Sequence, residues 1–381
     1  MADDFKYHID HHGSLVRPPA LLAARAAGLS GEALAATVEE AVEAAAHLQR
    51  RLVLSTVGDG QFRREHFESV VYDHVSGFAP VTGPTPLAEL AGIPFARRRA
   101  VTAGLAGPTG TAGPAGPTGL IADGRLAQAE VAPVLAVVDR PVFVALPSPG
   151  YLAAVGSALD GPAALDAVRA AGAALAASLH AEIEALAADG VAYVALGNPL
   201  YPVLLTVEGR ERLLAVLPAG VDADAVLAAM IEADRAAVTE LTVPEDFRVG
   251  LDLTDSGPLP TTARGWDPTA FETLIDATPF HRLSVDFPAE PTARLPLDLV
   301  KPGLVISLGV VDVASPELET VESILDLVDP IVEERGEYDV AIATNGGFAQ
   351  SADRPLMTQA EQNEKLRLVE MVARYYWGNE I

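Results

Sequence analysis

The stretch PVFVALPSP, residues 141–149, is a short run of β-branched and apolar residues that ends in a Pro-Ser-Pro turn. A second such run, VAYVALGNP at 191–199, follows a long Ala- and Leu-rich segment, 161–189, in which apolar residues recur every three or four positions. Short apolar strands separated by an amphipathic helix are typical of parallel sheets with crossover helices. The two runs therefore predict a βαβ unit.

The same alternation continues along the chain of 381 residues. Strands are predicted at 6–10, 51–59, 141–149, 191–199, 247–255, 282–288, 304–312 and 338–348. Helices are predicted at 31–50, 161–189, 210–240, 316–335 and 359–376, with a short one near 294–302. Eight strands alternating with helices are typical of a closed barrel. We therefore predict an α/β fold, a single (β/α)8 TIM barrel over residues 1–381.

Most of the predicted strands end in a polar residue or a Gly/Pro turn, and in such barrels the strand ends line the mouth where active sites are built. The long interval after the second strand predicts an insertion or lid at 76–130. It contains GLAGPTGTAGPAGPTG, residues 104–119, with glycine at every third position. This run is too short for a collagen triple helix, so it predicts a polyproline-like loop.

The amino-acid composition limits the kinds of molecule that the chain is expected to bind. The chain has 26 Lys and Arg against 52 Asp and Glu, a net charge of −26, which disfavours nucleic acid and anionic membrane surfaces. No apolar run is long enough to cross a membrane. The start, MADDFKYHID, shows no secretory signal, so a cytoplasmic protein is expected. The absence of cysteine excludes disulfides, thiolate nucleophiles and thiolate-bound zinc. Nothing in the sequence predicts an oligomeric state.

Three stretches resemble the catalytic barrel of cobalamin-independent methionine synthases, in the single-barrel branch of the methionine synthase and uroporphyrinogen decarboxylase-like superfamily. They are DHHGSLVRPP (10–19), STVGDGQFRREHF (55–67) and EKLRLVEMVARYYWGNE (364–380). The order of LPSP, LGVVDVASPELE and NGGF is similar as well. The resemblance implies a TIM barrel in which a His, two Cys and a Glu hold zinc, and in which a methyltetrahydrofolate methylates a thiol substrate.

The implied zinc ligands are replaced in this chain. Where the family's fifth strand carries His-x-Cys, this sequence has Asp252 and Thr254, and where the sixth carries Glu it has Ser284. Where the eighth carries Gln-Cys-Gly-Phe, it has Asn345 followed by Gly346. Zinc and homocysteine methylation are therefore not expected here.

The motifs that bind the amino-acid substrate differ too. Asp-Gly-Glu becomes Asp59-Gly60-Gln61, and the acidic pair after the fourth strand becomes Gly197-Asn198. The His expected after the seventh strand is Ala314. We expect a divergent, zinc-independent enzyme that performs acid/base lyase- or transfer-type chemistry on a small anionic metabolite, in specialised metabolism.

The predicted site uses the polar residues at the strand ends. The catalytic candidates are Asp252, His11, His12 and Asp255. The predicted substrate-binding residues are Ser14, Arg17, Asp59, Gln61, Arg63, Ser148, Asn198, Tyr201 and Asn345. Arg17, Arg63 and Arg64 are predicted anion clamps, because a guanidinium binds a carboxylate or phosphate through two hydrogen bonds. Each residue has a structural alternative: Arg17 as a surface ion pair, Asp255 as a helix cap, Tyr201 as packing.

Three alternatives stay open. His8, Asp10 and His12 lie on one side of a continuous strand and are a candidate facial triad for iron or another divalent metal. Methyl transfer from a folate to a non-thiol acceptor is a second possibility, and folate is then the cofactor; otherwise none is predicted. A non-catalytic binding or partner protein is the third.

Overall fold

The fold is built around one parallel sheet. The computed structural model describes residues 7–102, 120–157, 164–254, 265–277, 279–352 and 354–378. Six strands pair in sequence order: β5 (Phe143–Pro147), β6 (Tyr193–Gly197), β7 (Arg248–Asp252), β8 (Arg282–Asp286), β9 (Val305–Val311) and β10 (Val340–Thr344). All neighbouring pairs are parallel. The six strands predicted from 141 onward are therefore confirmed, each slightly shorter than its apolar run.

The two remaining predicted strands are reduced to single bridges at the sheet edges. Val57 pairs in parallel with Val142 before β5, and Ile9 pairs in parallel with Ile342 in β10. Ile9 N also donates to Ser55 Oγ at 3.0 Å, which links the two edge segments. Helix α2 continues to residue 51, so the predicted strand at 51–59 starts later and is interrupted by its Gly and polar turn. The structure thus supports a mixed α/β fold with six regular parallel strands.

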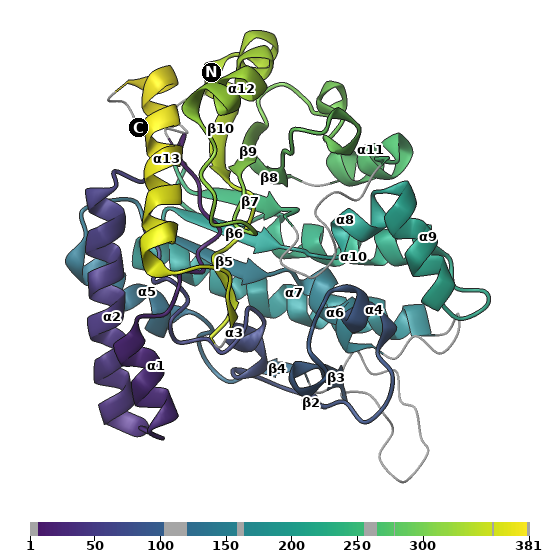
Figure 1. The fold of residues 1–381 in the computed structure, drawn as a ribbon. Coiled ribbons are helices and arrows are strands. Elements are labelled where there is room, and N and C mark those ends of the chain that lie inside the picture. Colours follow the sequence, from purple (N-terminus) through teal and green to yellow (C-terminus); the bar gives the residue numbers. More distant parts are fainter. Residues whose placement is uncertain are drawn as a thin grey trace.

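Helices connect and flank these strands (Figure 1). They are α1 (Pro19–Ala26), α2 (Gly31–Arg51), α5 (Gln128–Val137), α6 (Pro149–Gly156), α7 (Ala164–Asp189), α8 (Tyr201–Leu204), α9 (Val207–Val216), α10 (Ala223–Val238), α11 (Pro268–Ala277), α12 (Val321–Arg335) and α13 (Gln359–Trp377). The helix predicted at 210–240 is two helices, because Pro and Gly interrupt it at 218–220. Near 294–302 there are only the 3-10 turns η2 (Pro291–Ala293) and η3 (Leu297–Leu299).

The described part of the insertion predicted at 76–130, together with the residues just before it, forms short elements beside the sheet. They are α3 (Ser69–Tyr72), β1 (Val75–Ser76), β2 (Phe78–Pro80), α4 (Pro86–Leu90), η1 (Phe95–Arg97), β3 (Arg99–Val101) and β4 (Ile121–Ala122). Strands β1 and β4 pair, as do β2 and β3. The Gly-Pro loop 104–119 lies outside the described residues. Near the end of the insertion, the carboxylate of Glu182 in α7 accepts from the side chain of Arg125 and from the amides of Leu126 and Ala127, which fixes the start of α5.

Register aligns the carboxyl ends of the strands. Gly197 in β6 pairs with Asp252 in β7, which pairs with Ser284 in β8. Residues in register on neighbouring strands point to the same face of a sheet, so this row fixes where a site can form. After β10, the chain continues through β11 (Ala349–Ser351) and β12 (Arg354–Pro355) into α13, and η4 (Glu337–Asp339) precedes β10. Within the described part, no helix has the length and apolar character needed to span a bilayer.

Candidate active site

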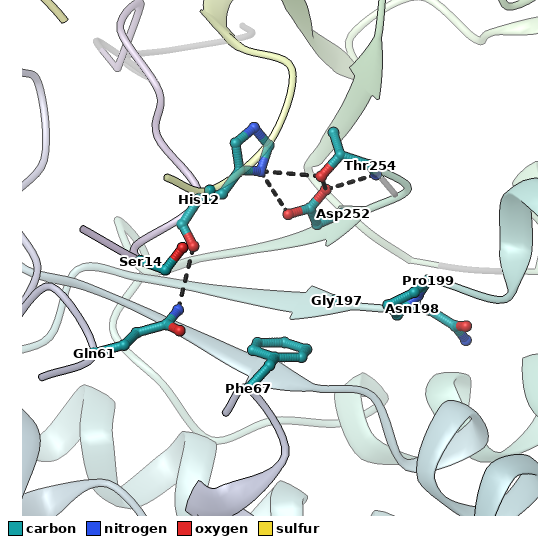
Figure 2. Close-up of a pocket in the computed structure, with 10 residues that line it drawn as sticks. His12, Ser14, Gln61, Phe67, Gly197, Asn198, Pro199, Asp252 and Thr254 are labelled. Atoms are coloured by element: carbon teal, nitrogen blue, oxygen red, sulfur yellow. Dashed lines mark hydrogen bonds and ion pairs between the residues drawn. The ribbon is translucent and has the colours of Figure 1, made fainter. Parts of the chain in front are cut away.

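A pocket lies at the carboxyl ends of these strands (Figure 2). It is lined by His12, Ser14, Gln61, Phe67, Gly197, Asn198, Pro199, Asp252, Thr254 and Gly347. The space between its lining atoms is about 470 Å³, a figure that includes the part open to solvent. Five of these residues were predicted from the sequence as site residues, and they come from segments more than 200 residues apart.

The most polar contact in the pocket joins His12 to Asp252. Nδ1 of His12 lies 2.7 Å from Oδ2 of Asp252, and Nε2 lies 2.8 Å from the carbonyl oxygen of Thr344. A carbonyl only accepts, so Nε2 carries a hydrogen. The Thr254 hydroxyl donates to Oδ1 of Asp252 at 2.7 Å and thus presents a lone pair to Nδ1 at 3.3 Å. Every neighbour of the ring therefore accepts, and this favours the doubly protonated imidazolium.

The electrostatics agree with this geometry. Burial opposes a charge on His12, but the adjacent Asp252 carboxylate outweighs it and raises the pKa of His12 to about 9. Burial likewise opposes ionisation of Asp252, and His12 together with Thr254 outweighs it, so that the pKa of Asp252 is lowered. The side chains are only 7% and 13% exposed, so solvent weakens their attraction little. The pair is an imidazolium and a carboxylate at neutral pH.

Hydrogen bonds fix the orientation of the charged Asp252 side chain. Its Oδ1 accepts from the backbone N of Thr254 at 2.8 Å in addition to the Thr254 hydroxyl. Oδ2 binds His12, so both carboxylate oxygens already have partners. Asp252, the first acid/base candidate from the sequence, is therefore held by hydrogen bonds beside His12.

Ser14 and Gln61 complete one side of the pocket. Gln61 Nε2 donates to the His12 carbonyl at 3.3 Å, and Gln61 itself has a positive φ of 56°, a strained conformation for a side chain of this size. Ser14 Oγ accepts from Ala349 N at 3.4 Å. The Ser14 hydroxyl also occupies the space that a side chain at Gly347 would need.

The other two histidines of the N-terminal stretch are apart from the pocket. His11 Nε2 donates to the Thr56 carbonyl at 3.3 Å, and its ring packs edge-on against Phe143, so burial lowers its pKa to about 3. His8 stacks on Trp377 with ring centres 4.3 Å apart, and burial lowers its pKa to about 4. Both rings are neutral at pH 7. His11 does not line the pocket, in contrast to the role predicted for it.

The predicted metal triad is not assembled. His8 packs on the C-terminal helix, Asp10 pairs with Arg282 at 2.6 Å, and His12 pairs with Asp252. Each of the three side chains therefore has a different partner, and the segment forms no regular strand beyond the bridge at Ile9. Nowhere in the described ranges do three or more His, Cys, Asp or Glu side chains come together in a way that could hold a metal.

Arg17 is a structural residue here, which corrects the predicted anion clamp. Its guanidinium is buried and donates to the backbone carbonyls of Gln61 at 2.8 Å, Ala349 at 3.0 Å and Arg64 at 3.2 Å. These bonds join the first and second edge segments to the chain after β10. A guanidinium occupied in this way offers little to a ligand.

Of the other predicted clamps, Arg64 is paired with the buried Glu130 at 2.6 Å, and Arg63 also lies away from the pocket. Its closest carboxylate is Glu39 of α2 at 3.6 Å, and Arg63 does not line the pocket. Asp59 is buried, and its Oδ1 accepts from Gln61 N at 2.8 Å, so it shapes the turn that carries Gln61. Burial raises the pKa of Asp59 to about 7, and the nearby Glu130 adds to this shift.

The polar residues after β5 and β6 form a buried network behind the pocket wall. Asn198 Nδ2 donates to Ser148 Oγ at 3.0 Å and to Asp234 Oδ2 at 3.2 Å, and the Tyr201 hydroxyl donates to the same Asp234 oxygen at 2.8 Å. Gly150 N donates to Asp234 Oδ1 at 2.7 Å. Burial raises the pKa of Asp234 to about 6. Ser148 and Tyr201 thus hold Asn198 in place without lining the pocket.

Two predicted residues remain. Asn345 is used in packing the loop after β9: its Nδ2 donates to Asp312 at 3.1 Å and its Oδ1 accepts from Val313 N at 2.9 Å. Asp255 lies outside the described residues. The prediction omitted Phe67, Pro199 and Gly347, and it named Gly197 and Thr254 only as replaced positions. Only Phe67 carried a usable signal, an aromatic residue at the end of the motif that follows the second edge segment.

The residues at the implied zinc positions do not fit a thiolate-rich zinc site. Asp252, Thr254, Ser284 and Asn345 occupy them, and the chain contains no cysteine. Asp252 already binds His12 and Thr254, and Asn345 already binds Asp312 and Val313 N. A structural or catalytic zinc site needs three or four Cys, His, Asp or Glu side chains whose ligand atoms are directed at one point.

The sequence matches no known family model and no curated protein. Solved structures do match. A Listeria monocytogenes protein described as a candidate vitamin-B12 independent methionine synthase is 19% identical, with a TM-score of 0.65 over 98% of both chains. A B12-independent methionine synthase from Shewanella sp. W3-18-1 is 16% identical, with a TM-score of 0.71 over 97% of both chains. A methyltransferase from Methanosarcina mazei is 14% identical, with a TM-score of 0.50 over 99% of this chain and 96% of that one.

Identities this low establish the fold and leave the activity open. The matches extend over nearly the whole length of each chain. The chain has the α/β fold of the B12-independent methionine synthase-like proteins.

Proposed function

We propose that the chain is an enzyme in which the His12–Asp252 pair exchanges a proton with a small metabolite in this pocket, without zinc. The observation that carries the proposal is the 2.7 Å contact of the two side chains at the carboxyl ends of the strands. A buried ion pair is often neutral for stability or costs it. Perturbed ionisation inside a pocket is more typical of catalytic sites than of structural ones.

We propose which proton of His12 moves from the hydrogen-bond partners of its ring. Nε2–H of His12 is held by the Thr344 carbonyl, which cannot take the proton. The proton between Nδ1 and Asp252 Oδ2 is the mobile one, and Asp252 stabilises the imidazolium before transfer. Because the pKa of His12 is about 9, the pair acts first as an acid, giving the Nδ1 proton to a substrate atom, and His12 takes a proton back from water before the next turnover. This supports lyase- or transfer-type chemistry that generates negative charge on the substrate.

The expected anionic substrate has less support. No Lys or Arg is among the residues that line the pocket in the described part of the chain, and the His12 charge is balanced by Asp252. We therefore propose a small polar metabolite, and any anionic group on it would bind against the His12 imidazolium or outside the pocket.

The test is proton exchange and turnover in heavy water. The purified protein is incubated in D2O with a metabolite extract, and mass spectrometry follows deuterium incorporation and new products. Wild type and His47→Gln should give the same changes, because His47 lies on α2 beside Glu43 and does not line the pocket. His12→Gln and Asp252→Asn should abolish them. Turnover that survives in both pocket variants, or no turnover in wild type, would overturn the proposal.

Zinc content is a second, independent test. Protein purified without added metal should contain far less than one zinc per chain, and stoichiometric zinc would contradict the zinc-independent assignment. Methyl transfer from a folate is the rival function, favoured by the methyltransferase neighbours. Calorimetry with methyltetrahydrofolate decides it: binding that is lost in Asp252→Asn would favour methyl transfer over the acid/base assignment.

A further inference from the structure

The pocket has an aromatic wall formed by Phe67. Figure 2 shows this ring on the side opposite His12 and Asp252, with one face turned toward them. The ring rests against Gly197 at the end of β6, where an added Cβ would lie 2.8 Å from Cζ and 3.1 Å from Cε1. Glycine at this position therefore leaves the space that the ring occupies.

Phe67 is held in place by its neighbours. The guanidinium carbon of Arg64 lies 5.9 Å from the ring centre, and Arg64 is itself fixed by two hydrogen bonds to Glu130, at 2.8 and 2.6 Å. The residues on either side of Phe67 are tied together, since His66 Nδ1 lies 2.7 Å from Glu68 Oε2.

A third element adds to this fixation. The Tyr151 hydroxyl of α6 donates to Glu68 Oε1 at 2.5 Å, and Tyr151 and Glu68 are both buried. The turn that carries Phe67 is thus anchored to α6 on one side and, through Arg64 and Glu130, to α5 on the other. The ring is preorganised, so a ligand that stacks on it does not have to order it.

The groups around the ring are polar and largely uncharged. Ser14 and Gln61 lie on one side, and Thr254 lies beside the compensated His12–Asp252 pair. A flat apolar face bordered by neutral donors and acceptors fits a planar group with a polar edge better than an aliphatic chain, because offset stacking adds to the gain from burial alone.

We propose that Phe67 is a stacking platform and that the pocket takes a planar, uncharged, conjugated group of its ligand, with a hydrogen-bond donor and acceptor on its edge. The inference rests on the proposed function only in placing the substrate in this pocket. Phe67 and Gly197 together then determine specificity: the ring supplies the platform, and the glycine sets its position.

Benzamide and cyclohexanecarboxamide are a matched pair of probes, since they share the carboxamide and differ in the flatness of the ring. Their dissociation constants are measured by NMR shift titration of the full-length protein. Benzamide should bind about three- to ten-fold more tightly to wild type, the range expected for one aromatic contact. Phe67→Leu should weaken benzamide by the same factor and leave cyclohexanecarboxamide within two-fold.

The control is Phe95→Leu. Phe95 also lies under an arginine, with Arg98 5.8 Å from its ring centre, but it is 57% exposed and outside the pocket. This variant should bind both probes as wild type does. Gly197→Ala is the second test variant, because it displaces the ring without removing it and should weaken benzamide too. Thermal melts confirm that each variant is folded.

Equal binding of the two probes to wild type, unchanged benzamide binding in Phe67→Leu, or no binding of either probe would each overturn the platform. These outcomes are separate from the proposed chemistry. If deuterium exchange depends on His12 while the probes show no preference, the proton transfer stands and the platform fails. If the preference is seen but exchange does not depend on His12, the platform stands as a binding site and the proposed enzyme fails.

Discussion

Oδ2 of Asp10 accepts a hydrogen bond from Nε of Arg282 at 2.6 Å, and the two side chains are 4% and 0% exposed. The pair joins the N-terminal edge segment to β8. Arg282 also lies over the ring of Tyr193, 5.9 Å from its centre, so the ion pair is enclosed by the sheet. Asp10 is two residues before His12, and its negative charge helps to raise the pKa of His12.

Asp10→Asn is expected to destabilise the fold by about 3–5 kcal/mol, because it leaves the buried Arg282 charge without its carboxylate. Urea unfolding followed by circular dichroism measures this. Asp276→Asn is the matched control: it breaks an ion pair with Lys301 in which both side chains are more than 60% exposed, and it should change stability by less than about 1 kcal/mol. Equal changes in the free energy of unfolding for the two variants would show that the buried ion pair contributes no more to stability than the exposed one.

Asp252→Asn should remove most of the upward pKa shift of His12. In the folded wild type the pKa of His12 is about 9, above the unfolded value of 6.5. The stabilisation from its protonation is therefore fully present below pH 6.5 and is lost as the pH rises through 9. Wild type should become less stable between pH 7 and 9.5, and Asp252→Asn should show a much flatter profile over that range.

NMR titration of the His12 ring locates the pKa directly. A midpoint near 9 in wild type that moves toward 6.5 in Asp252→Asn is the expected result. His47→Gln serves as control for the assignment of signals, since His47 is 40% exposed and lies beside Glu43. A wild-type midpoint near 6.5 would mean that the ring is neutral at physiological pH and that the acid role is wrong.

Much of the fold was predictable because strands and helices alternate in the sequence with clear apolar patterns. The six strands from 143 onward lie within their predicted ranges. The two edge segments could not be placed in the same way. They carry His12, Ser14 and Gln61 of the site, and their polar sequences, interrupted by glycine, pair with the sheet through the bridges at Ile9 and Val57.

The sequence predicted which end of the strands carries the site, but it predicted much less well which side chains contact one another there. His12 and Asp252 were both named, but nothing in the sequence says that residues 240 positions apart form one pair. Arg17 illustrates the converse. A guanidinium next to a Gly-Ser turn is typical of anion binding, yet the carbonyls that it satisfies belong to remote segments that only the folded chain brings together.

Gly150→Ala tests the network behind the pocket wall. A Cβ at this position would collide with the Met230 backbone and lie 2.8 Å from Asp234 Oδ1, so helices α6 and α10 would have to separate. The expected cost is about 1–3 kcal/mol, typical of overpacking. Gly83→Ala is the control, because nothing lies within 4 Å of its added Cβ. A thermal melt compares the two; a neutral Gly150→Ala would mean that this helix contact adapts easily.

Arg17→Met separates the structural role from an anion clamp. Because Arg17 donates to the carbonyls of Gln61, Ala349 and Arg64, its loss should destabilise the fold by about 2–4 kcal/mol, leaving buried acceptors unpaired. Arg63→Met should cost less than about 1 kcal/mol, because the Arg63 side chain, although only 24% exposed, lies 3.6 Å from a Glu39 carboxylate that is 60% exposed. Urea unfolding gives both values. If Arg17→Met kept full stability and lost only turnover on an anionic substrate, the clamp predicted from the sequence would be restored.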